Sequence, residues 1–250
     1  MPEFQVVGNV DPFLLVTLKK GERIYAESNA MVTMDAVLEL KGKMAGGFLS
    51  SLARKFTSGE SFFQQSLEAT QGEGQALLSP TLPGDIELLD VGVNQYRLND
   101  GAFVAASDTV QISVKSQGIG QALFGGTGGF FIMETSGQGK LAVSGFGTMF
   151  GLDVKAGSDV IVDNFHVVAW DRNLNYNISL STSKGGFLSN LVGSVTTGEG
   201  VVNRFSGNGK VYVCSRNRSG FLGWIASSLP GTGSSNRGSG SNINISRDLL

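Results

Sequence analysis

The chain has few of the residues on which catalytic and metal sites depend. Its 250 residues include one cysteine, Cys214, and one histidine, His166. A single thiol cannot form a disulfide within the chain or supply a thiolate metal cluster, and it fits a reducing compartment. The sequence therefore gives no sign of a disulfide-stabilised fold or of a cysteine-based metal centre.

Charged residues are also scarce, at 16% of the chain. Nineteen basic residues nearly balance twenty-one acidic ones, and the net charge is −2. Because positive charge is not in excess, the composition gives no general reason to expect nucleic acid or an anionic membrane as partner.

Long apolar runs are missing as well. No window of about 18 apolar residues exists that could cross a bilayer, and the most apolar stretch, 119–133, is interrupted by five glycines. The opening residues, MPEFQVVGNVDPF, contain acidic residues and no basic stretch before an apolar run, which is not typical of a signal peptide. We expect a cytoplasmic protein that could touch a membrane surface but does not span it.

Glycine, by contrast, is abundant, with 36 residues. The glycines separate short runs rich in Val, Ile, Phe and Thr, which is typical of many strands joined by tight turns. Alternation of apolar and polar residues is clear at Val110, Ile112 and Val114. These patterns predict an all-β fold.

A pair of phrases occurs three times. The first is a Gly followed by an alternating apolar run, at Gly21, Gly101 and Gly157; the second is a Gly-x-Gly before a β-rich run, at Gly72, Gly137 and Gly207. Tandem copies usually fold as repeats of one supersecondary unit. We predict three β-rich copies, over 1–92, 93–154 and 155–219, followed by a short apolar segment and a Gly/Ser-rich tail over 220–250, all in one compact body.

The Gly-x-Gly phrases do not fit nucleotide-binding motifs. A P-loop requires Ser or Thr after its Lys, but Lys140 precedes Leu141 and Lys210 precedes Val211. A dinucleotide fingerprint leads into a helix, whereas these phrases lead into strands. We interpret them as hairpin turns, in which glycine supplies a positive φ.

Copies one and three share an insertion that begins GGFLS, and a third GFL phrase follows the last copy. The apolar residues of the insertions lie at helical spacing, which predicts short amphipathic helices there. Such helices could cover the β core, form a subunit interface or touch a lipid surface, and we favour cover or an interface. The candidate interface residues are Phe48, Leu49, Leu52, Phe187, Leu188, Leu191, Phe221, Leu222 and Trp224.

Other candidate sites have ordinary structural interpretations. A metal site at His166 would need carboxylates such as Asp163 and Asp171, and Cys214 has no evident base beside it, so we expect a structural histidine and a buried, unreactive thiol. Repeated acids near the copy openings favour turn and pairing roles over hydrolysis. We expect no catalytic residues, no cofactor and no bound metal, with an enzyme using an unrecognised carboxylate site as a remote alternative.

A basic cluster with interleaved aromatics lies late in the chain. Basic and aromatic side chains on a sheet can bind single-stranded nucleic acid by phosphate pairing and base stacking. Because strand faces also carry such residues for ordinary packing, we treat a nucleic-acid-binding ring as the alternative function. The residues concerned are Arg204, Lys210, Tyr212, Arg216 and Arg218.

The phrases GERIYAESNAMVTMD, GESFFQQSLEATQGEGQALLSPTLPGDIELLDV and GEGVVNRFSGNGKVYVCSR resemble the mitochondrial biogenesis family named for altered inheritance of mitochondria, formerly a domain of unknown function. The resemblance runs from about Phe13 to Arg216. It implies a double-stranded β-helix fold like that of the tryptophan RNA-binding attenuation protein, and subunits that form rings, with a trimer favoured. It implies no catalytic residues. A shared fold does not transfer RNA binding.

From these observations we expect a non-enzymatic scaffold or interaction protein that forms a closed homo-oligomer and binds a protein partner. Nucleic acid is not the expected partner.

Overall fold

A computed structural model of the chain describes residues 1–43, 64–116, 131–180 and 201–229. The chain divides into two compact units, Met1–Asn217 and Arg218–Leu250. The first unit contains strands β1 to β19 and a 3-10 helix, η1 (Asn164–His166); the described part of the second contains one helix, α2 (Arg218–Ser228). The described residues are therefore mostly β, as the sequence predicted.

The strands of the first unit form four antiparallel sheets. In spatial order, the first sheet contains β1 (Glu3–Val7), β2 (Phe13–Leu18), β7 (Gly74–Leu78) and β4 (Met31–Met34). The second sheet contains β5 (Leu38–Lys43), β6 (Gln64–Ala69), β3 (Arg23–Glu27), β10 (Phe103–Ser107), β13 (Gly139–Ser144) and β8 (Ile86–Val91).

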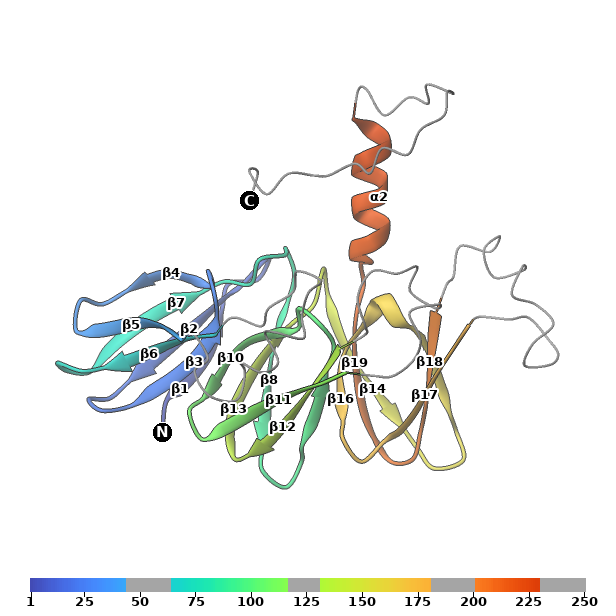
Figure 1. The fold of residues 1–250 in the computed structure, drawn as a ribbon, viewed down its shortest axis with the longest axis horizontal. Coiled ribbons are helices and arrows are strands. Elements are labelled where there is room, and N and C mark those ends of the chain that lie inside the picture. The colour runs from blue at the N-terminus through green and yellow to red at the C-terminus, as the bar shows by residue number, and fades with distance from the viewer. Residues whose placement is uncertain (44–63, 117–130, 181–200, 230–250) are drawn as a thin grey trace. The chain divides into compact units, whose positions relative to one another are not determined.

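The other two sheets are built from later strands. The third contains β11 (Val110–Ser116), β12 (Phe131–Gly137), β9 (Tyr96–Leu98), β16 (Val167–Asp171), β19 (Gly209–Cys214) and β14 (Met149–Val154). The fourth contains β15 (Val160–Asp163), β18 (Val201–Ser206) and β17 (Asn175–Leu180). Within this unit the sheets follow one another in layers, from the blue strands to the orange ones (Figure 1).

Three clusters of buried apolar side chains fill the spaces between successive sheets. The first cluster includes Leu14 of the first sheet and Leu67 of the second. The second cluster includes Leu141 of the second sheet and Leu98 of the third, and the third cluster includes Trp170 of the third sheet and Phe205 of the fourth. Each cluster removes apolar surface from water, which is the main contribution to the stability of a stack of this kind.

The two inner sheets are covered on both faces, and their central strands are therefore apolar throughout. In β10, Val104 packs in the first cluster, whereas Phe103 and Ala106 pack in the second. All five side chains of β10 are buried. A strand with two buried faces loses the alternation that marks a half-exposed strand. The alternation predicted at Val110 is confirmed in β11, where it faces the second cluster.

The expectation of hairpin turns at the Gly-x-Gly phrases is wrong. Strands β6 and β7, β12 and β13, and β18 and β19 are consecutive but lie in different sheets. Each phrase therefore carries the chain from one sheet to another. Gly137 and Gly207 do have positive φ, at 89° and 115°, whereas Gly72 does not. A positive φ is a local requirement, and it does not determine which strand becomes the neighbour.

Candidate interaction surfaces

Helix α2 presents large apolar side chains to solvent. Phe221, Leu222 and Trp224 are all exposed, and no residue of the helix is buried. The rings of Phe221 and Trp224 stack with their centroids 6.1 Å apart. Exposed apolar side chains gathered on one element typically mark a surface that binds another molecule.

The local sequence explains where this helix ends and how its sides differ. Gly220, Gly223 and Ser227 fall at the spacing of one helix face, and Phe221 and Leu222 lie away from it. At the C-terminal end the Ser227 and Ser228 hydroxyls donate to the Trp224 carbonyl, at 2.8 and 2.9 Å. The helical spacing predicted for this GFL phrase is confirmed. The other candidate interface residues, Phe48, Leu49, Leu52, Phe187, Leu188 and Leu191, lie outside the described residues.

Two basic residues of the predicted nucleic-acid cluster pair with carboxylates. Arg204 of β18 contacts Asp159, with Nη2 2.7 Å from Oδ2, and its Nε donates to the same oxygen. Lys210 of β19 has Nζ 3.8 Å from Asp153 Oδ1. Part of the positive charge that a phosphate would meet is therefore balanced within the chain.

The remaining members of that cluster lie in different surroundings. Tyr212 packs against the second buried cluster, and burial raises the pKa of its hydroxyl. The Arg216 guanidinium lies 5.9 Å from the centre of the Phe146 ring, and Arg218 begins α2. Arg204 belongs to the fourth sheet and Tyr212 to the third. Nucleic-acid binding by these residues stays a prediction.

His166 and Cys214 contact each other through the backbone. The Nδ1 atom of His166 lies 2.7 Å from the carbonyl oxygen of Cys214, and because a carbonyl only accepts, the ring donates. The Cys214 thiol is buried, donates to the Arg216 carbonyl at 3.4 Å, and has its pKa raised by burial. A raised pKa keeps the thiol protonated and unreactive at neutral pH.

The acidic residues near these groups bind backbone N–H groups. Asp163 Oδ1 accepts from the Phe165 amide at 3.0 Å, and Asp171 Oδ2 accepts from the Lys210 amide at 2.8 Å. Burial raises the pKa of Asp171. In the part of the chain that the structure describes, no three His, Cys, Asp or Glu side chains come close enough together to hold a metal ion.

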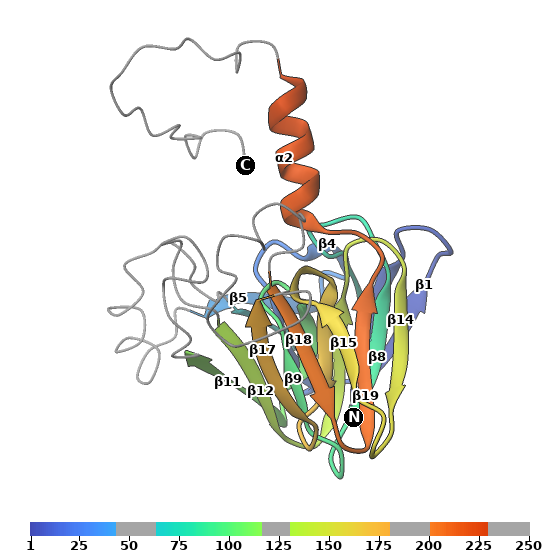
Figure 2. The same cartoon turned by 90° about the vertical axis from the view of Figure 1, so that its right-hand side faces the viewer.

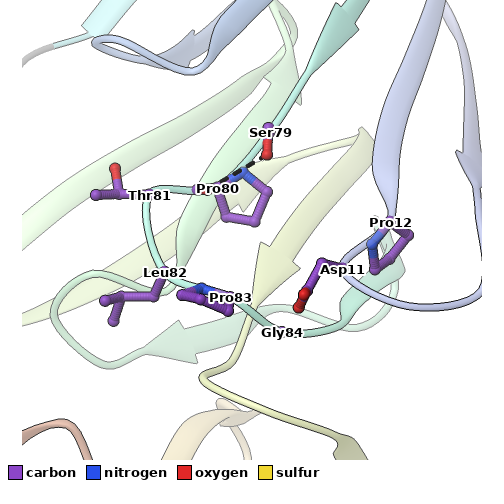
Figure 3. A pocket seen from close by; sticks show the side chains of 8 residues that line it. All are labelled: Asp11, Pro12, Ser79, Pro80, Thr81, Leu82, Pro83 and Gly84. Atoms are coloured by element: carbon purple, nitrogen blue, oxygen red, sulfur yellow. Dashed lines mark hydrogen bonds between the residues drawn. The ribbon is translucent and has the colours of Figure 1, made fainter.

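Two cavities lie in loops that sequence reasoning did not single out. One, of about 220 Å³, lies beside the loop that leads from β7 to β8 (Figure 3). Its lining residues are Asp11, Pro12, Ser79, Pro80, Thr81, Leu82, Pro83 and Gly84. A second, of about 280 Å³, is lined by Val93, Asn94, Gln95, Asp171, Arg172 and Asn173. The first cavity has one carboxylate, that of Asp11, among rigid prolines. The sequence feature that could have pointed to this loop is its SPTLPG run.

Exposed apolar residues on edge strands were also missed. Val32 lies on β4, Phe150 on β14 and Ile161 on β15, and all three are exposed. Each of these strands stands at the end of its sheet. The runs MVTM and VIVD are apolar, but nothing in a local pattern distinguishes an edge strand from a central one.

Within the described ranges, the structure has no helix that is both long enough and apolar enough to cross a bilayer.

The chain is similar to a known protein family and to proteins of Streptococcus pyogenes, among others. The model of a family described as mitochondrial biogenesis AIM24 matches residues 4–216. A protein of Streptococcus pyogenes serotype M6, described as uncharacterized, is 39% identical over 226 residues, covering 88% of this chain and 87% of that protein. The crystal structure of protein SPYM3_0169 from Streptococcus pyogenes matches with a TM-score of 0.76 at 34% identity, covering 92% of this chain and 100% of that one.

Proposed function

We propose that this chain, which belongs to the mitochondrial biogenesis AIM24 family, is a non-enzymatic scaffold or interaction protein that works in the cytoplasm as a homo-oligomer, with a trimer favoured. Membership of the family agrees with the resemblance found in the sequence. The relative from Streptococcus pyogenes serotype M6 is described as uncharacterized, so the proposal depends on the surfaces of this chain.

We further propose that the chain consists of three copies of one six-strand unit, in a double-stranded β-helix arrangement like that of the tryptophan RNA-binding attenuation protein. The strand pairings support this proposal. In each of the sets β2–β7, β8–β13 and β14–β19, the first, sixth and third strands are neighbours in one sheet, and the fourth, fifth and second are neighbours in the next. Counting by pairing assigns β8 to the second copy and β14 to the third.

The observation that carries the interaction role is the exposed apolar side of α2. Phe221, Leu222 and Trp224 place two aromatic rings and a leucine in water, where they lower the solubility of a free chain. Aromatic anchors of this kind contribute most of the binding energy in many protein interfaces. We infer a protein partner for this helix.

The chemistry of the basic cluster supports the choice of a protein over nucleic acid. Arg204 and Lys210 each have a carboxylate partner, and the whole chain carries a net charge of −2. Nucleic-acid binding draws most of its affinity from uncompensated Lys and Arg side chains that neutralise phosphates.

The test uses the full chain carrying Phe221→Ser, Leu222→Ser and Trp224→Ser together, with Gly223→Ala, which has open space around it on the side of the helix away from Phe221 and Leu222, as the control. Proteins that co-purify from the native cell should be retained by wild type and the control and lost from the triple variant. Equal recovery with the triple variant would contradict the interaction role. Light scattering at micromolar concentration should give a mass near three times 26.3 kDa; the mass of a single chain would contradict the assembly.

A further inference from the structure

Each of the two inner sheets contains one junction, at which a strand of one six-strand unit pairs with a strand of the following six-strand unit. In the second sheet β3 lies beside β10, and in the third β9 lies beside β16. The two junctions have matching registers. Ala26 is opposite Ala105 and Tyr25 opposite Ala106 in one, and Leu98 is opposite Ala169 and Arg97 opposite Trp170 in the other. Both junctions are antiparallel.

Strand β4 occupies the same place in its unit as β10 and β16. Each pairs with the last strand of its unit, and each has a register shift at the same point, after Met31, Phe103 and Val167 respectively. Unlike β10 and β16, β4 stands at the end of its sheet. Its outer side therefore has no strand partner among the described residues.

Strand β15 is the counterpart of β3 and β9. Tyr25, Arg97 and Ile161 each lie six residues before the residue at which the register shift begins. Strand β15 also stands at the edge of its sheet, with β18 on one side and no strand on the other among the described residues; Figure 2 shows β17, β18 and β15 side by side. Strands β4 and β15 are thus the two halves of the junction that the chain forms twice internally, and each lacks its partner strand among the described residues.

Burial distinguishes the internal junctions from the two free edges. Val104 and Val168, at the equivalent position in β10 and β16, are 0% and 3% exposed and pack in the cluster shared with the preceding unit. Val32 of β4 is 47% exposed. Ile161 of β15 is 64% exposed. An apolar side chain that is buried at two equivalent positions and exposed at the third indicates a missing neighbour.

Charge also separates these two edges from the edges formed by β5 and β8. Strand β4 has no charged residue, and β15 has only Asp163. Strand β5, another edge, carries Glu39 and Lys41, and the edge strand β8 carries Glu87 and Asp90. Charged side chains on an edge prevent pairing with another chain, whereas an uncharged apolar edge invites it.

We propose that β15 of one copy pairs with β4 of the next copy, so that the three-stranded fourth sheet and the four-stranded first sheet become one continuous antiparallel sheet. The internal junctions determine the register: Val162 lies opposite Thr33 of the next copy, and Ile161 opposite Met34 of the next copy. The Val32 side chain then enters a space in the preceding copy that corresponds to the spaces filled by Val104 and Val168 within the chain. This inference rests on the proposed homo-oligomer and identifies its interface.

The proposed contact is head to tail, because β4 and β15 are different surfaces. A series of copies then keeps one free β4 at one end and one free β15 at the other until it closes into a ring. A dimer whose two-fold axis passes through the paired strands would bring the same strand of both copies together, and this arrangement therefore excludes it. Because β4 and β15 are different strands, each edge can be blocked separately, and this makes the head-to-tail arrangement testable.

The first experiment blocks the two edges separately. Val32→Lys would place a charge in the apolar space of the preceding copy. Ile161→Pro removes a backbone N–H that points toward the next copy. The internal counterpart of Ile161 is Arg97. Two residues after Arg97, the Asn99 amide donates to the Val168 carbonyl, and residues two apart in a strand have their N–H groups on the same side. Val93→Lys, in an exposed turn, and Ile161→Ala, which retains the N–H, are the matched controls.

Light scattering at micromolar concentration should show oligomers for wild type and both controls, and single chains of 26.3 kDa for Val32→Lys and Ile161→Pro. Circular dichroism should show that both variants remain folded. Mixing the two variants should give a species of two chains, because one supplies an intact β15 and the other an intact β4. An oligomer that survives either substitution, or a mixture that stays as single chains, overturns the proposal.

The second experiment traps the register. In a Cys214→Ser background, Ile161→Cys with Met34→Cys should form disulfide-linked chains on mild oxidation, whereas Ile161→Cys with Lys41→Cys should not. A disulfide formed only within single chains would overturn pairing between copies. If wild type itself is a single chain, both the oligomer and this interface fail; if it is an oligomer that the edge variants leave intact, the interface alone fails.

Discussion

Arg97 and Glu134 face each other across β9 and β12, with Nε 2.9 Å from Oε1, and both side chains are largely buried. Lys115 of β11 binds the other carboxylate oxygen. The Arg97 guanidinium also lies 5.2 Å from the ring centre of Tyr176 in β17 and donates to the Arg172 carbonyl. This group of side chains therefore ties three strands of the third sheet to the fourth sheet.

Replacing Glu134 should destabilise the protein in a pH-dependent way. Burial opposes ionisation of the carboxyl, but hydrogen bonds from Lys115 and Arg97, with their charges, outweigh it and lower the pKa of Glu134. A lowered folded-state pKa gives stability that is present above the unfolded value and lost as pH falls through the folded one. Glu134→Gln should cost about 1–3 kcal/mol at neutral pH, and the difference from wild type should shrink below about pH 4.

Urea unfolding at several pH values measures this effect. Asp90→Asn is the control, because Asp90 pairs with Lys140 but is 81% exposed on its side chain. An exposed pair contributes about 0–1 kcal/mol. A Glu134→Gln penalty that stayed constant down to pH 3 would show that the carboxylate charge is not its source.

Trp170 should be the most costly aromatic residue to truncate. It is buried, and its ring packs edge-on against Tyr176 and Phe205 at centroid distances of 5.2 and 5.6 Å. Trp170→Ala should lose about 3–5 kcal/mol. Trp170→Phe should lose clearly less, because the buried indole Nε1 has no hydrogen-bond partner among the described residues.

The chain has two tryptophans, and the second provides the control. Trp224 is 65% exposed on α2, so Trp224→Ala should leave the unfolding midpoint of single chains nearly unchanged. Fluorescence of the Trp224→Ala variant should report Trp170 alone, with blue-shifted emission and weak acrylamide quenching. Equal quenching of both tryptophans would contradict the burial of Trp170.

Cys214 should react with thiol reagents only when the protein unfolds. Its side chain is buried, and burial raises the thiol pKa, so little thiolate forms at mildly alkaline pH. Ellman's reagent should label native wild type at least tenfold more slowly than the urea-unfolded protein. In a Cys214→Ser background, Val93→Cys should label fast in the native state; similar native rates for Cys214 and that cysteine would refute the prediction.

Gly84 should not accept a side chain. A Cβ placed there would lie 2.0 Å from the backbone oxygen of Gly145, and φ is 154°. Because backbone must move to relieve such a contact, Gly84→Ala should cost more than about 2 kcal/mol. Gly42→Ala meets nothing within 4 Å and should change the thermal midpoint little. Equal midpoints for the two variants would contradict the close approach of these loops.

Much of the local structure could be predicted from the sequence. Apolar alternation at Val110 and the glycine-bounded β-rich runs predicted strands where strands occur, and the third GFL phrase predicted a short helix where α2 lies. The burial of the Cys214 thiol was also expected and agrees with the structure. These features depend on backbone preferences and side-chain spacing within a few residues, which the sequence states directly.

The tertiary structure alone decided which strands are neighbours. The Gly-x-Gly phrases have the local marks of hairpins, yet β12 and β13 belong to different sheets. Arg97 lies opposite Trp170, more than seventy residues away, because their strands complete one sheet. Val32 and Val104 belong to similar short apolar strands, but Val32 is exposed on an edge strand, whereas Val104 is buried in the cluster between the first and second sheets. Pairing between distant strands depends on the free energy of burying their faces together, and no local pattern records that.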